Sequence, residues 1–108
     1  MSGPVLLALA IAFELVGTAS LKASDGFTRW LPSSFTVVGY LCSFYLLSLA
    51  LRQMPVGVVY AIWSGAGTAL MAVIGYLAFG EALNAMKIGS IGLIVLGVVG
   101  LGLAQRGG

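Results

Sequence analysis

The sequence is poor in charge, holds a single cysteine, Cys42, and has no histidine at all. One cysteine cannot form an internal disulfide, and without histidine there is no His/Cys metal site, so we predict neither a metal nor another cofactor. Only 7% of the residues are charged, against roughly 25% in a soluble domain, so the chain has too little polar surface to face water. With no nucleophile–base pair in sight, the sequence does not predict an enzyme.

The few charges also exclude a nucleic-acid partner. Five basic and three acidic residues give a formal charge of +2. The basic residues are scattered along the chain and form no stripe that could follow a phosphate backbone.

Hydrophobic residues make up 60% of the 108-residue chain, and they gather in four long runs. A membrane-spanning helix needs about 20 mostly apolar residues, and four runs qualify: 4–21, 31–51, 56–79 and 88–104. In hydrocarbon the backbone must satisfy its own hydrogen bonds, so such runs are helices. The first run lacks a basic flank and contains an acid, which favours a retained span over a cleaved signal peptide. We predict an all-α protein whose single domain, residues 1–108, crosses the lipid bilayer four times.

The basic residues at the two sides of this four-span arrangement are nearly balanced. Arg52 and Arg106 fall on one side, and Lys22, Arg29 and Lys87 on the other. Positive charge normally marks the cytoplasmic side. Two against three gives almost no bias, which is either ordinary scatter in a short chain or a sign of dual topology, with copies inserted both ways and paired antiparallel.

Glu14 lies near the middle of the first predicted span. A charged group there costs about 2.5 to 3.5 kcal/mol on insertion scales, and intramembrane acids usually mark ion pathways. Small residues at helical spacing, Ala10, Gly17 and Thr18, lie on the same face and leave room beside the carboxylate. A proton- and cation-binding site is therefore favoured, with a protonated, purely structural glutamate as the alternative.

Aromatic residues of other spans suit an organic cation beside that acid. Tyr60 and Trp63 lie three residues apart on one face of the third span, next to Ser64, and Tyr40 lies in the second span. Aromatic faces attract cations by roughly 0.5 to 2 kcal/mol. Each aromatic alone is more often packing or an interface anchor, and only their combination with Glu14 indicates a binding site.

Glycines in the third and fourth spans mark packing surfaces. Gly65 and Gly67 weaken the third span locally, so they mark either a bend or close static packing. The glycines of the fourth span gather on one face with almost no polar side chain, which predicts an association surface between copies; they are Gly89, Gly92, Gly97 and Gly100.

Taken together, these residues resemble the small multidrug resistance transporters, and most closely the EmrE-like branch that exports quaternary cations. The resemblance covers essentially the whole chain without obvious gaps. Its segments are Glu14–Thr18, Leu21–Lys22, Gly26–Arg29, Pro32, Ser43–Phe44, Leu46–Leu47, Pro55–Gly57, Tyr60–Gly67, Leu93–Ile94 and Gly97–Val98. Gly102 departs from the branch, which often has asparagine there.

The resemblance implies an antiparallel, dual-topology homodimer in the bacterial inner membrane that exchanges protons for small organic cations and confers drug and antiseptic resistance. In it, Glu14 would bind a proton or the cation in turn. The other implied roles are cation binding by Tyr40, Tyr60 and Trp63, with Gly17, Thr18 and Ser64 as neighbours, a helix bend at Gly65 and Gly67, and a dimer contact at Gly92 and Gly97.

Three alternatives stay open at this point. The guanidinium-exporting branch of the same family differs just after the first-span acid, where this chain has Gly17 and Thr18. A non-transporting assembly subunit would use Glu14 for helix packing, and a passive channel would conduct without a coupled proton. The preferred cation, the proton-to-cation ratio and an unequal pair of chains are left undecided.

Overall fold

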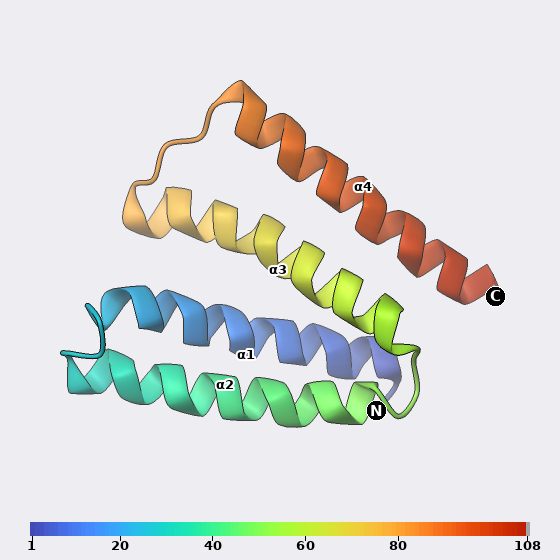
Figure 1. The fold of residues 1–108 in the computed structure, drawn as a ribbon, viewed down its shortest axis with the longest axis horizontal. Helices are drawn as coiled ribbons and strands as arrows, with labels where there is room; N and C mark the ends of the chain where they lie inside the picture. The colour runs from blue at the N-terminus through green and yellow to red at the C-terminus, as the bar shows by residue number, and fades with distance from the viewer. Residues whose placement is uncertain (108) are drawn as a thin grey trace. The chain divides into compact units, whose positions relative to one another are not determined.

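The computed structural model describes residues 1–107, and within them four α-helices are joined by short connections (Figure 1). They are α1 (Gly3–Ala23), α2 (Trp30–Ala50), α3 (Val56–Phe79) and α4 (Ala85–Gly107). All four are long and apolar enough to cross a membrane, which confirms the all-helical prediction and its four spans. Residue 108 and the side chain of Arg106, which entered the charge balance, lie outside the described residues.

The helix bounds differ from the predicted runs mainly beside charged residues. α3 has the predicted bounds, and α2 is shifted by one residue, but α1 ends two residues late and α4 begins three residues early. The predicted runs stopped next to Lys22 and Lys87, whereas a helix continues through a lysine because its long stem carries the charge to water. At α4, the Asn84 side chain accepts a hydrogen bond from the Lys87 backbone N–H at 2.9 Å and caps the helix there.

The helices form two compact units, Met1–Pro55 with α1 and α2, and Val56–Gly108 with α3 and α4. In the first unit the chain reverses through Asp25, Gly26 and Phe27, which all have positive φ (50°, 71° and 65°). The fully buried Ser24 holds this turn, since its hydroxyl donates to the Leu21 carbonyl at 2.6 Å and accepts from the Phe27 N–H at 3.0 Å. The turn returns α2 antiparallel to α1.

α1 and α2 are in backbone contact along a row of small residues on α2. Thr36, Gly39 and Ser43 are spaced three and four residues apart, so they share one face, and all three are buried. The Ser43 hydroxyl donates to the Ala10 carbonyl of α1 at 2.6 Å. A Cβ on Gly39 would lie only 2.9 Å from the Phe13 carbonyl oxygen. This α1–α2 seam fixes the spacing of the helix that carries Glu14.

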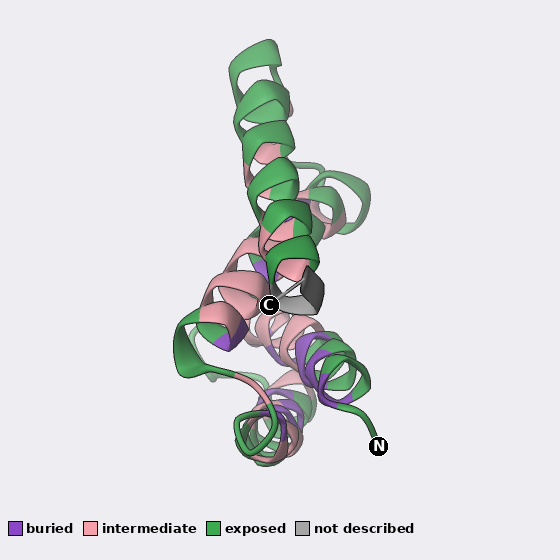
Figure 2. Ribbon diagram, turned by 90° about the vertical axis from the view of Figure 1, so that its right-hand side faces the viewer, coloured by how far each residue is buried: buried purple, intermediate pink, exposed green. Residues whose placement is uncertain are grey.

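In the second unit, α4 packs on α3 at Gly65. A Cβ on Gly65 would lie 2.7 Å from Cγ2 of Val98, so this glycine makes room for the α4 side chain. α3 ends at Gly80, whose φ of +67° turns the chain, and the Glu81 side chain folds back over Gly75. None of the described α4 residues is buried, and Figure 2 shows the helix in the colours of exposed and intermediate residues.

Candidate functional site

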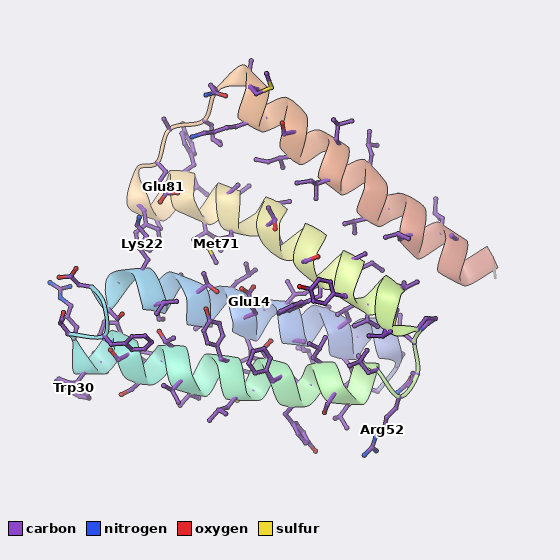
Figure 3. The ribbon with its side chains drawn as sticks, viewed as in Figure 1. Glu14, Lys22, Trp30, Arg52, Met71 and Glu81 are labelled. Carbon is purple, nitrogen blue, oxygen red and sulfur yellow. The ribbon has the colours of Figure 1, made fainter. Side chains whose placement is uncertain are left out.

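Glu14 lies midway along α1, and it is partly buried (Figure 3). Its Oε1 accepts a hydrogen bond from the Thr18 hydroxyl at 2.7 Å. The four-residue spacing places Thr18 one helical turn after Glu14 on the same face. Thr18, predicted as a small residue beside the carboxylate, therefore also contacts it directly.

Tyr40 of α2 joins this pair through Thr18. Its hydroxyl oxygen lies 2.8 Å from the Thr18 hydroxyl oxygen. A threonine hydroxyl has one proton, and Thr18 gives that proton to Glu14, so Tyr40 is the donor in the second bond. The result is a directed hydrogen-bond chain, Tyr40 to Thr18 to Glu14, which we call the hydroxyl–carboxylate chain.

The Tyr40 ring reaches this position because α1 has no side chain at Gly17. A Cβ on Gly17 would lie 2.8 Å from Cδ1 of Tyr40 and 2.9 Å from Cε1. The other side of the ring is supported along α2 by Phe44, which stacks at a centroid distance of 6.1 Å and an interplanar angle of 16°. Gly17 therefore belongs to the site as the space that Tyr40 fills.

The hydroxyl–carboxylate chain brings dipoles to Glu14 but no positive charge. The nearest basic residue along α1 is Lys22, eight residues on, or about 12 Å at the rise of an α-helix. An ionised carboxylate in an apolar span is costly unless it is paired. A proton or a cation supplies what the two hydroxyls lack, so the site suits either of these as its ligand.

The predicted aromatic pair lies in the second unit. The Tyr60 and Trp63 rings meet edge to face, with centroids 5.8 Å apart and an angle of 67°. Tyr60 is 63% exposed, whereas Nε1 of Trp63 is buried and has no hydrogen-bond partner in the described part of the chain. Ser64 donates its hydroxyl to the Tyr60 carbonyl at 2.7 Å, so Ser64 offers a ligand only its acceptor oxygen.

The structure adds a packing role for one of the predicted glycines and leaves the others open. Gly65, predicted at a bend, is also the contact point for Val98, and Gly67 is buried within a helix that is continuous from Val56 to Phe79. Apart from its own stretch of α4, no atom of the described residues lies within 4 Å of a Cβ placed on Gly92 or Gly97. The bend and the dimer contact stay predictions.

Sequence reasoning missed Gly39, the residue that lets the two helices of the first unit touch. A signal was available, because Gly39 is the only glycine between residues 30 and 50 and lies between two small polar residues at helical spacing. Its significance depends on which face of α2 meets α1, and spacing within one span does not give that.

Helices long and apolar enough to span a membrane, with an acid that accepts a hydrogen bond from a threonine hydroxyl inside one of them, define the class of small multi-pass membrane proteins. A model of the family described as Small Multidrug Resistance protein matches residues 3–94, and the chain belongs to this family. It is thus a multi-pass protein of the bacterial inner membrane.

Similar proteins support the same family along nearly the full length of the chain. The quaternary ammonium compound-resistance protein QacE of Escherichia coli is 44% identical over 106 residues, which cover 98% of this chain and 96% of that protein. The multidrug resistance protein EbrA of Bacillus subtilis is 50% identical over 97 residues, 90% of this chain and 92% of the relative. An uncharacterised membrane protein of the same organism, YvaE, is 48% identical over 102 residues, 94% and 86% of the two chains.

If Glu14 binds a cation, Thr18→Val should weaken that binding, because valine keeps the shape of threonine but removes the hydroxyl that links Tyr40 to Glu14. A hydrogen bond to a charged group contributes about 1.5 to 3 kcal/mol, so we expect the Kd for tetraphenylphosphonium to rise about 10- to 100-fold. Equilibrium binding in detergent measures this. Thr18→Ser is the matched control and should bind within about threefold of the native protein, since it keeps the hydroxyl; equal losses in both variants would exclude a role for the hydroxyl.

Proposed function

We propose that the protein is a proton-coupled exporter of hydrophobic or quaternary organic cations, which confers resistance to drugs and antiseptics. The observation that carries the proposal is the hydroxyl–carboxylate chain, in which Glu14 lies inside an apolar span and accepts a hydrogen bond from a neutral hydroxyl. The printed names of QacE and EbrA, which refer to resistance to quaternary ammonium compounds and to multiple drugs, support cations as the substrate class.

Exchange follows if one carboxylate binds either a proton or a cation. When a proton occupies Glu14, the carboxyl can donate to Thr18, and Thr18 can then donate to Tyr40, because each hydroxyl both donates and accepts. When a cation displaces the proton, the chain takes the direction found here. Thr18 therefore satisfies both states of Glu14, and competition for the carboxylate links cation binding to proton release.

The aromatic residues contribute selectivity for organic cations in this proposal. Tyr60 presents an exposed ring, and Trp63 presents a buried N–H that has no hydrogen-bond partner among the residues that the structure describes. A ring facing a cation adds about 0.5 to 2 kcal/mol and tolerates different cation shapes. We therefore propose Tyr60 and Trp63, like Tyr40, as cation-binding residues, which suits apolar cations that a carboxylate alone would hold weakly.

A homodimer of oppositely inserted copies completes the proposal. The unburied α4, with open positions at Gly92 and Gly97, supports association through this helix, because small residues let membrane helices approach closely. The near balance of basic residues on the two sides supports insertion in both orientations. Two copies would then supply two Glu14 carboxylates, and alternating access would expose them to each side of the membrane in turn.

The test is proton release on cation binding. Tetraphenylphosphonium added to the purified protein in weakly buffered detergent should release protons, and its affinity should fall as the pH is lowered. Solid-supported-membrane currents with tetraphenylphosphonium, a quaternary ammonium ion and guanidinium then compare substrates. Binding without proton release would indicate a passive channel, absence of binding would indicate a non-transporting subunit, and currents with guanidinium alone would move the protein to the guanidinium-exporting branch.

A further inference from the structure

α1 and α2 approach each other closely at Gly39, directly beside the hydroxyl–carboxylate chain. A Cβ on Gly39 would lie 2.9 Å from the Phe13 carbonyl oxygen, 3.0 Å from the Gly17 nitrogen and 3.1 Å from the Gly17 Cα. All three are backbone atoms of α1, and they cannot move aside by a side-chain rotation. Any side chain at position 39 therefore pushes the two helices apart, by several tenths of an ångström.

The distance between α1 and α2 at Gly39 determines the position of the Tyr40 hydroxyl. Tyr40 is the next residue along α2, its ring lies on the bare Cα of Gly17, and its hydroxyl is 2.8 Å from Thr18. O–H···O bonds in proteins span about 2.5 to 3.0 Å, so the present distance leaves little room for separation. A shift of the α2 backbone by several tenths of an ångström lengthens this bond beyond its normal range.

Ser43 anchors the same seam one turn further along α2. Its buried hydroxyl donates to the Ala10 carbonyl at 2.6 Å, and Ala10 lies one turn before Glu14, at the carbonyl that the Glu14 backbone N–H meets in an α-helix. The seam is thus fixed on both sides of Glu14, through Ser43 at Ala10 and through Gly39 at Gly17.

We propose that Gly39 is a positioning residue of the cation site: backbone contact with α1 at Gly39 keeps Tyr40 within reach of Thr18, which in turn orients the Glu14 carboxylate. Gly39 touches neither proton nor cation and acts through Tyr40. The inference rests on the proposed function, because the orientation of Glu14 matters only if the carboxylate binds a ligand.

The test is a double-mutant cycle on Gly39→Ala and Tyr40→Phe, read by tetraphenylphosphonium binding and by the pH dependence of its Kd. Gly39→Ala should raise the Kd about three- to tenfold, the size of one lost hydrogen bond. In the Tyr40→Phe background, which has already lost that bond, Gly39→Ala should change the Kd less than twofold. The pH dependence should shift with Gly39→Ala only where Tyr40 retains its hydroxyl. Full additivity of the two losses would overturn the positioning role.

Two further variants separate positioning from general damage. Gly57→Ala makes the same chemical change at a position where, in the described part of the chain, the added Cβ meets nothing within 4 Å beyond its own stretch of α3. It should leave binding unchanged. Ser43→Ala adds no bulk, so it keeps the test valid if Gly39→Ala does not fold. It removes the other anchor of the seam, and the rise in Kd that it causes should also be smaller in the Tyr40→Phe background. Additive effects of Ser43→Ala and Tyr40→Phe would again overturn the proposal. If the native protein binds tetraphenylphosphonium without releasing protons, the proposed function fails instead, whatever the outcome of the cycle.

Discussion

Glu14→Gln should abolish pH-gradient-driven uptake of tetraphenylphosphonium into proteoliposomes and leave a folded protein. The amide cannot release a proton or carry a negative charge, but its oxygen can still accept the hydrogen bond that Thr18 now donates to Oε1. A unit charge about 4 Å from a cation, at an effective dielectric constant of about 20, contributes about 4 kcal/mol, so the affinity should fall about 1,000-fold.

The control for this result is Asp25→Asn, which removes an acid from the turn between α1 and α2. Asp25 has a φ of 50°, a left-handed conformation that asparagine tolerates well. The neighbouring Thr28 hydroxyl bonds the backbone oxygen of Asp25, which the substitution retains. Uptake by Asp25→Asn should match the native protein. Gradient-driven uptake by Glu14→Gln at the native rate would show that the coupled proton is bound elsewhere.

Much of the fold was predictable because membrane spans obey a length and composition rule. Uninterrupted apolar residues predicted α3 with its observed bounds, and Pro55 immediately before it suits the start of a helix. Errors arose where polarity and helical structure diverge: the predicted α1 stopped at Leu21, although the helix continues through Lys22 to Ala23. Apolar composition locates the part of a helix that lies in hydrocarbon, whereas capping groups such as Asn84 decide where the helix starts.

The site was predictable in its parts and less so in its geometry. Helical spacing alone placed Thr18 beside Glu14 and Tyr60 beside Trp63, and both pairs are in contact. The bond between Thr18 and Tyr40 joins residues 22 positions apart, and it depends on how closely two helices approach. That distance is set by small residues whose effect appears only in packing, since one glycine looks like any other until its neighbouring helix is known.

Variants with opposite charge bias should each lose transport alone and regain it when produced together. Gln53→Lys with Arg29→Gln and Lys87→Gln changes the basic residues from two against three to three against one, and Arg52→Gln with Ala82→Lys changes them to one against four. By the positive-inside rule the first set of substitutions favours the loop between α2 and α3 in the cytoplasm, and the second set favours the opposite orientation. If the working form is an antiparallel dimer, a population fixed in one orientation cannot form it.

Reporter fusions at the C-terminus, one active only in the cytoplasm and one only outside, measure the orientation of each variant, and ethidium efflux from cells measures transport. The native chain should give signal with both reporters, and each charge-biased variant with one. Co-production should restore efflux to about half the native level, or more if opposite copies pair preferentially. All five substituted positions lie outside the hydroxyl–carboxylate chain and the seam. A loss of efflux that is seen with one variant alone and reversed by the partner variant therefore reflects orientation and not damage to the site. Full efflux by a variant with one fixed orientation would instead mean that the two copies are inserted in the same direction. The antiparallel arrangement proposed above would then be wrong, and the two Glu14 carboxylates would have to share a cation in a parallel dimer.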